Sequence, residues 1–168
     1  MSIRSRIALF AALFLGMQTL VAEAWDAGLS AILIDRWTVA PCAWLARHLL
    51  GQADALAIGS RVVSPAASMN VLFGCDGSDV ALLLVAAVLA APLGWKPRVA
   101  GILAGLLFVF SVNQARLLAL YCSLLAGGRW FGTLHEVVAP LAVVALVLSY
   151  FLALLAFGRP APAPGPSL

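Results

Sequence analysis

Four long runs of apolar residues, nearly free of charge, decide what this chain can fold into. Each is close to the roughly 20 residues that an α-helix needs to cross about 30 Å of hydrocarbon. The chain as a whole is 64% hydrophobic and only 10% charged, whereas a soluble domain carries about 25% charged residues. We therefore expect an all-α integral membrane protein with about four transmembrane helices. The runs are Ile7 to Ala24, Asp79 to Trp95, Val99 to Ala126 and Val137 to Phe157.

The basic residues predict how these helices are oriented. One side of the four-helix arrangement receives Arg4, Arg6, Lys96, Arg98 and Arg159, and the positive-inside rule assigns that side to the cytoplasm. Both termini are then cytoplasmic, and "KPR", Lys96 to Arg98, is expected to be the short connection of an antiparallel helical hairpin. The opposite side receives the segment 25–78 and the loop Gly127 to Thr133. Four arginines also fall there and weaken the bias: Arg36, Arg47, Arg61 and Arg129.

The first run, within residues 1–24, has a second interpretation. Two arginines, an apolar stretch and then Ala22-Glu23-Ala24 resemble a signal peptide with its cleavage site. The apolar stretch is long for a signal peptide, so we expect a transmembrane helix or an uncleaved signal-like anchor. Cleavage would leave three helices and would not move the following segment to the other side.

The segment 25–78 is expected to lie outside the membrane. From Leu29 to Leu50 an amphipathic pattern predicts a helix in the membrane interface, restarting at Pro41. β-Branched and apolar residues then flank a Ser-Pro turn, which predicts a short hairpin that delivers the chain to Cys75. Residues 79–157 form the expected three-helix membrane core, and the Pro-rich tail 158–168 is expected to be disordered.

The polar stretch "SVNQAR", Ser111 to Arg116, interrupts the third apolar run. An arginine inside or at the edge of a bilayer is costly unless it is paired or hydrated, and it marks a functional site by default. Arg116 is such a residue, and Asn113 lies three positions earlier on the same helix face. The structural alternative is a snorkelling arginine with an asparagine that bonds neighbouring helices.

Depth in the membrane brings three reactive side chains to one level. Eighteen residues separate Arg98 from Arg116, so at about 1.5 Å each the second lies roughly 27 Å above the first, near the outer boundary of the hydrocarbon. Cys75 precedes the second run and His135 precedes the fourth, both at their outer ends. We expect Cys75, Arg116 and His135 to line one polar pocket. A nucleophile, an acid/base and a cation are what thiol acyl transfer requires.

Each of these residues also has a simpler interpretation. A single cysteine near a membrane boundary is often an inert packing residue, and a single histidine in a loop is often only solvated. Cys42 is expected on the same side as Cys75, so a disulfide between them is an alternative. Cys122 has the surroundings of a packing residue. No C-x-x-C motif and no metal-ligand spacing occurs, so neither a cofactor nor a metal is predicted.

The motifs "GCDGSD" and "NQAR", followed by a histidine that opens the last helix, resemble those of the exosortase/archaeosortase family of membrane cysteine transpeptidases. The resemblance covers about residues 61–157 and is closest to the short forms. Many members have A-C-S-G where this chain has Gly74-Cys75-Asp76-Gly77. By resemblance, Cys75, Arg116 and His135 match the family's catalytic residues.

The resemblance implies a function in protein sorting at the bacterial inner membrane, with the site facing the periplasm. The expected partners are exported proteins whose carboxy-terminal signal combines a short motif, a transmembrane helix and a basic cluster, together with membrane lipids. Cleavage would use Cys75 as nucleophile, His135 as proton donor and Arg116 as the stabilising cation. Asn113 supports the site, and Asp79 is expected to orient His135 or to pair with Arg116.

Two other classes of function remain open. A small noncatalytic membrane assembly subunit would use Asn113 and Arg116 for helix association. A membrane thiol-disulfide oxidoreductase would need a redox-active cysteine pair, which the missing C-x-x-C argues against. Nucleic-acid binding is not expected, because no nucleic-acid-reading motif occurs.

Overall fold

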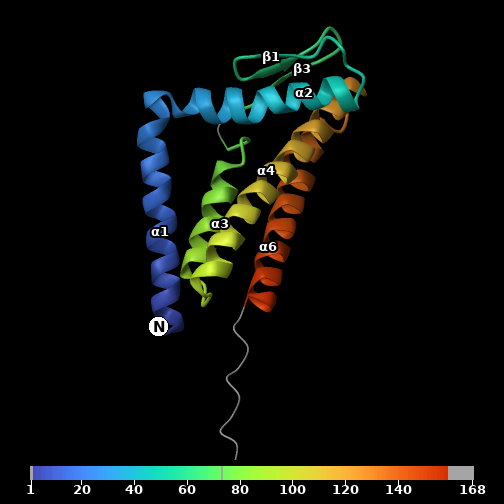
Figure 1. Cartoon of the computed structure of the whole chain (residues 1–168). Helices are drawn as coiled ribbons and strands as arrows, with labels where there is room; N and C mark the ends of the chain where they lie inside the picture. Colours follow the sequence, from blue (N-terminus) through green and yellow to red (C-terminus); the bar gives the residue numbers. More distant parts are fainter. Residues whose placement is uncertain (1, 73, 159–168) are drawn as a thin grey trace, which may run out of the picture.

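The computed structural model describes residues 2–72 and 74–158 and is mostly helical (Figure 1). Within these residues three helical segments are long and apolar enough to cross a membrane. They are α1 (Ile3–Ala24), α4 (Trp95–Leu125) and the segment Phe131–Phe157, which joins α5 (Phe131–Thr133), the π-helical turn η3 (Leu134–Val138) and α6 (Ala139–Phe157). These segments indicate a helical membrane protein. The expected tail from 159 onward, with Arg159, lies outside the described residues.

The second apolar run forms a shorter helix than expected. Helix α3 covers Ser78–Ala90, 13 residues, or about 20 Å, so the expected count of four spanning helices is not confirmed. Ala91 takes an extended conformation, with φ −69° and ψ 152°. The cause is local, since a residue that precedes proline, here Pro92, is driven out of the helical region.

The expected connection at "KPR" was wrong. Residues 91–94 make the turn, and Lys96 to Arg98 belong to the first turn of α4, where Pro97 needs no backbone donor. Arg98 Nη2 donates to the carbonyls of Ala91 at 3.1 Å and Leu93 at 3.0 Å. The antiparallel α3–α4 hairpin itself is present (Figure 1).

A further helical segment, called the crossing segment below, runs across one end of the bundle formed by α1, α3, α4 and α6 (Figure 1). It consists of the π-helical stretches η1 (Trp25–Leu29) and η2 (Ala31–Val39), followed by α2 (Ala40–Leu49). The chain turns out of α1 at Gly28, whose φ of 104° suits glycine. Pro41 lies in the first turn of α2, as the sequence predicted. The buried face repeats every three to four residues: Ile34, Thr38, Val39, Cys42, Ala43 and Ala46.

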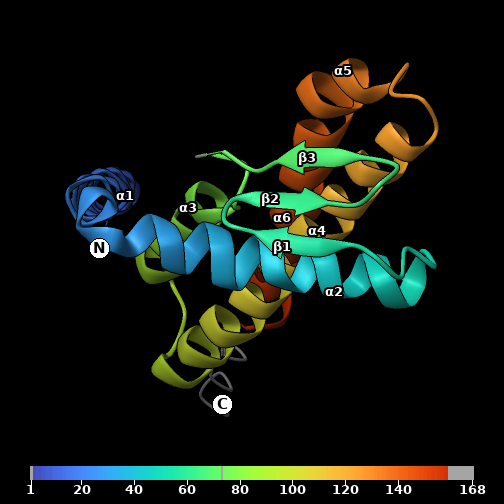
Figure 2. The ribbon, with the colours of Figure 1, turned by 90° about the horizontal axis from the view of Figure 1, so that it is seen from above.

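A three-stranded antiparallel sheet packs over this crossing segment (Figures 1 and 2). Its strands are β1 (Leu56–Ile58), β2 (Arg61–Val63) and β3 (Ser68–Asn70), in that order. The hairpin expected around the Ser-Pro turn is β2–β3, with Val62 opposite Met69 and both side chains buried. Strand β1 was not predicted, so the sheet has one strand more than the expected hairpin, in a fold that is otherwise helical as expected.

Two apolar cores hold the molecule together, and α4 contributes to both. The first, under the crossing segment and the sheet, includes Leu117, Leu120 and Tyr121 of α4. The second lies among α3, α4 and α6 around Leu84 and Val109. At 31 residues α4 is about 46 Å long, more than the roughly 30 Å of a hydrocarbon layer. Its excess length reaches the first core.

Candidate active site

The loop that carries Cys75 is a tight turn ahead of α3. Gly74 and Gly77 have φ values of 82° and 85°, which non-glycine residues rarely adopt. The Asp76 carboxylate accepts from the backbone N–H of Gly74 at 3.2 Å and of Ser78 at 3.3 Å. Asp76 precedes the N-cap residue Gly77 and accepts from the first N–H of α3, where a negative charge is favourable. The turn presents a half-buried Cys75 directly ahead of the helix.

Arg116 and Asn113 of α4 both reach this turn. Arg116 Nη2 lies 3.8 Å from Cys75 Sγ, and Asn113 Nδ2 donates to the Cys75 carbonyl oxygen at 3.2 Å. The spacing of three residues places both side chains on the face that meets the turn. Arg116 Nε is buried without a hydrogen-bond partner among the described residues. A guanidinium so placed can stabilise negative charge at the sulfur or beside it.

His135 lies in η3, and π-helical turns are often found at functional sites. Its ring stacks on Phe131 with a centroid distance of 5.6 Å, and Nδ1 is buried without a partner in the described part of the chain. No hydrogen bond joins His135 to Cys75 or Arg116 among those described. Its approach to them stays a prediction.

A cavity of about 260 Å³ lies beside Arg116, between α4 and the η3–α6 segment. Leu134 and Val138, on either side of His135 in the sequence, line this cavity together with Arg116. The rest of its lining is aliphatic and includes Ala115 and Ala119. The helix that carries His135 and the helix that carries Arg116 therefore enclose one space next to the proposed cation.

Asp79 contacts a residue that the sequence analysis did not consider. Its Oδ1 accepts a hydrogen bond from Gln18 Nε2 of α1 at 3.0 Å. The two partners expected for it, His135 and Arg116, make no hydrogen bond to it in the described residues. Asp79 therefore joins α1 to the start of α3.

Gln114 is the buried residue that the sequence analysis missed. It is 4% exposed, and its Nε2 points to the carbonyls of Trp37 at 3.4 Å and Thr38 at 3.3 Å in η2. Further along α4, Tyr121 Oη donates to Ser64 Oγ at 2.7 Å, in the turn between β2 and β3. Helix α4 thus makes hydrogen bonds to the Cys75 turn, to the crossing segment and to the turn between β2 and β3.

The other two cysteines are in different surroundings. Cys42 is fully buried, and burial raises the pKa of its thiol to about 12, with nearby Cys122 adding to the increase. A thiol with that pKa stays protonated at neutral pH, and the thiolate is the nucleophile. All three cysteines are free, so the alternative Cys42–Cys75 disulfide is not formed. The described residues contain no cluster of three or more potential metal ligands.

Comparisons with protein-family models, with curated proteins and with solved structures found no match.

Proposed function

We propose that this chain is a membrane-embedded cysteine peptidase or transpeptidase that cleaves the carboxy-terminal sorting signal of exported proteins at the outer face of the bacterial inner membrane. The observation that carries the proposal is the 3.8 Å contact between Cys75 Sγ and Arg116 Nη2. Asn113 supports it by holding the Cys75 carbonyl. Arg116 Nε has no hydrogen-bond partner among the described residues, and an unpaired buried arginine lowers the stability of a membrane protein. Stabilising the negative charge that develops in the reaction would explain why the chain has an arginine at this position.

In the proposed reaction the Cys75 thiolate attacks the carbonyl carbon of the scissile peptide bond. A C–S bond forms, the C–N bond breaks, and His135 gives a proton to the departing amine. Arg116 stabilises the thiolate before attack or the oxyanion after it. Water or an amine then opens the thioester and releases Cys75.

The cavity beside Arg116 suits an apolar segment next to the scissile bond. Its lining is aliphatic apart from Arg116 itself. Without a bound substrate, this aliphatic lining would be in contact with lipid or solvent. In this proposal the substrate lies between α4 and α6, with its scissile carbonyl at the Arg116 end.

Substitution of the three cysteines tests the nucleophile. We expect Cys75→Ala to abolish cleavage of a co-expressed substrate, whereas Cys42→Ala and Cys122→Ala retain most of it, because neither has Arg116 as a partner. The measurement is accumulation of uncleaved substrate in cells at matched expression of each variant. Normal processing by Cys75→Ala would rule out the cysteine mechanism.

The partners of Cys75 are tested in the same assay. We expect Arg116→Lys to lose most activity, because lysine keeps the charge but lacks the planar fork of donors. His135→Ala should slow cleavage by about 10²- to 10⁴-fold if the imidazole transfers the proton. Full activity of Arg116→Lys would show that Arg116 supplies only a positive charge or a packing contact, and not two directed hydrogen bonds.

A second candidate is a noncatalytic assembly subunit, favoured by one observation. The hydrogen bonds of Asn113 and Gln114 go to backbone carbonyls inside the molecule, as expected of residues that stabilise packing. This candidate predicts that Cys75→Ala functions normally while Asn113→Leu and Gln114→Leu reduce the amount of folded protein. The proposed enzyme predicts loss of function in Cys75→Ala at unchanged protein level.

A further inference from the structure

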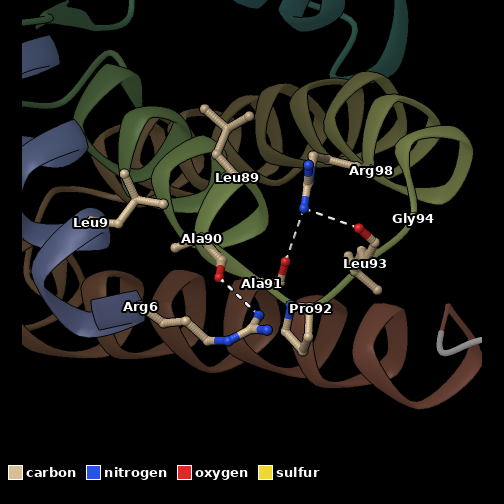
Figure 3. Close-up of a pocket in the computed structure, with 9 residues that line it drawn as sticks. All are labelled: Arg6, Leu9, Leu89, Ala90, Ala91, Pro92, Leu93, Gly94 and Arg98. Atoms are coloured by element: carbon tan, nitrogen blue, oxygen red, sulfur yellow. Dashed lines mark hydrogen bonds between the residues drawn. The ribbon is translucent and has the colours of Figure 1, made fainter. Parts of the chain in front are cut away.

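A cavity of about 550 Å³ lies at the end of α3 that is remote from Cys75. Figure 3 shows the residues that line it. Its walls are the start of α1, the last turn of α3, the 91–94 turn and the first turn of α4. Both ionisable residues in its lining are arginines, Arg6 and Arg98, and no acidic side chain is among them. The cavity therefore carries a formal charge of about +2, since arginine is always protonated.

The two guanidiniums are held in place by backbone oxygens. Arg6 Nη1 donates to the Ala90 carbonyl at 3.4 Å, and Arg98 Nη2 donates to those of Ala91 and Leu93 (Figure 3). Each guanidinium has five N–H donors, so these bonds leave most of them free for another acceptor. Arg98 Nε is buried and has no partner among the described residues. Two fixed guanidiniums with spare donors suit a phosphate group, which they can bind through paired hydrogen bonds.

An apolar groove continues from this cavity along α3, between α1 and α6. A space of about 430 Å³ shares Arg6 and Pro92 with the cavity. A third space of about 270 Å³ shares Phe10 and Ala87 with the second. Apart from Arg6, every residue that lines these two spaces is hydrophobic. The two arginines at one end suit the phosphate of a phospholipid. The apolar groove that continues from them suits one of its acyl chains.

We infer that this end of the molecule binds one anionic phospholipid, with its phosphate between Arg6 and Arg98 and an acyl chain in the groove. Charge selects this occupant, because basic pockets between membrane helices attract anionic head groups. A peptide helix ending in basic residues would be repelled by the same two arginines. The inference concerns a site remote from Cys75 and does not depend on the proposed peptidase activity.

Lipid titration of the purified full-length protein, followed by native mass spectrometry, tests the inference. We expect one phosphatidylglycerol to bind more tightly than phosphatidylcholine. Arg6→Gln and Arg98→Gln should each weaken phosphatidylglycerol binding about fivefold, the effect of roughly 1 kcal/mol for one basic residue near a membrane surface. Arg4→Gln and Lys96→Gln are the matched controls. They remove a charge near the same end but outside the cavity lining, and they should change binding less than twofold.

A further variant separates the acyl chain from the phosphate. Ala87 lines both apolar spaces, so Ala87→Phe should fill the groove and weaken phosphatidylglycerol binding while leaving both arginines intact. Arg98→Gln also removes the hydrogen bonds of Arg98 to the 91–94 turn and could disturb that turn. Ala87→Phe leaves these bonds intact, so its result does not depend on the turn. Inorganic phosphate, as a competitor at the same concentration as the lipid, should not displace it.

Three results would overturn the inference. Equal binding of phosphatidylcholine would remove the charge preference. Equal weakening by Arg4→Gln or Lys96→Gln would show a general surface attraction rather than a site. Displacement by inorganic phosphate, with no effect of Ala87→Phe, would show a simple anion site that does not hold lipid.

Discussion

Gly77 has no Cβ atom, and this allows Asn113 of α4 to pack closely against the Cys75 turn. A Cβ built on Gly77 would lie 3.1 Å from Asn113 Cγ, a tight contact that Asn113 could relieve only by moving a few tenths of an ångström. Gly74 has almost the same φ, but a Cβ there would meet only Asp79 Oδ2, at 3.8 Å. The two glycines therefore share a backbone requirement and differ in one contact.

Substitution of these two glycines separates backbone strain from the Asn113 contact. Both Gly77→Ala and Gly74→Ala should destabilise the turn by about 1–2 kcal/mol, because alanine disfavours a positive φ. Gly77→Ala must also displace Asn113, and loss of its hydrogen bond to Cys75 adds about 0.5–1.5 kcal/mol. Thermal unfolding in detergent should therefore show the lower midpoint for Gly77→Ala. Equal midpoints would mean that Asn113 moves aside at no cost.

The sequence placed Asn113 and Arg116 at the candidate site but did not predict which residues Gln114 contacts, and the reason is geometric. A polar residue in an apolar run is visible in the sequence, and a spacing of three places Asn113 and Arg116 on one helix face. Gln114 is about 100° further around the helix and faces η2 instead. Its acceptors are backbone carbonyls, which every residue has. The partners of Gln114 could therefore not be predicted from residue types, whereas Asn113 was assigned to the site by its spacing from Arg116.

At the scale of whole elements, hydrophobicity predicted that a helix follows Cys75 but not where it ends. The run from Asp79 to Trp95 is apolar apart from Asp79 itself, yet Pro92 and Gly94 end the helix at Ala90. Backbone restriction by proline outweighs an apolar pattern at that point. Strand β1 (Leu56–Ile58) was missed because the hairpin was located by its Ser-Pro turn, which joins β2 to β3, and the Gly59-Ser60 turn ahead of β2 was not recognised.

The contact of α4 with α6 depends on two glycines one helical turn apart, Gly101 and Gly105. A Cβ on Gly105 would lie 2.7 Å from Leu84 Cδ2 and 3.0 Å from Tyr150 Cε1, and Tyr150 Oη donates to the Gly101 carbonyl at 2.7 Å. Small residues spaced four apart allow such close approach between membrane helices.

Gly105→Ala tests this close packing against a matched control, Gly16→Ala. Alanine should favour the helix by about 0.5–1 kcal/mol at either position. At Gly16 a Cβ meets nothing within 4 Å, so that variant should be unchanged or slightly more stable. At Gly105 overpacking should cost about 1–3 kcal/mol and lower the thermal midpoint. A midpoint raised equally in both variants would contradict the packing described for α4.

At the scale of the whole molecule, α4 is the element that connects the two ends. Its first turn carries Arg98 in the cavity proposed for lipid, and its last third carries Arg116 against Cys75. The eighteen residues between them correspond to about 27 Å along one continuous helix. The separation of the two sites therefore does not depend on the length of α3, which at about 20 Å would not cross a bilayer alone.

The orientation of the molecule follows from that separation and can be measured. If the basic end is cytoplasmic, as charge bias predicts, Cys75 lies at the outer face. A single cysteine introduced by Lys96→Cys, in a chain whose native cysteines are replaced, should react with a membrane-impermeant maleimide only after the cells are permeabilised. Arg129→Cys, in the exposed loop after α4, should react in intact cells. The reverse pattern would place Cys75 on the cytoplasmic side, where exported proteins have not yet crossed, and would exclude the proposed processing role. Reaction of both positions from outside would mean that α4 does not span the membrane, because one continuous helix cannot cross the bilayer and leave both of its ends on the same side.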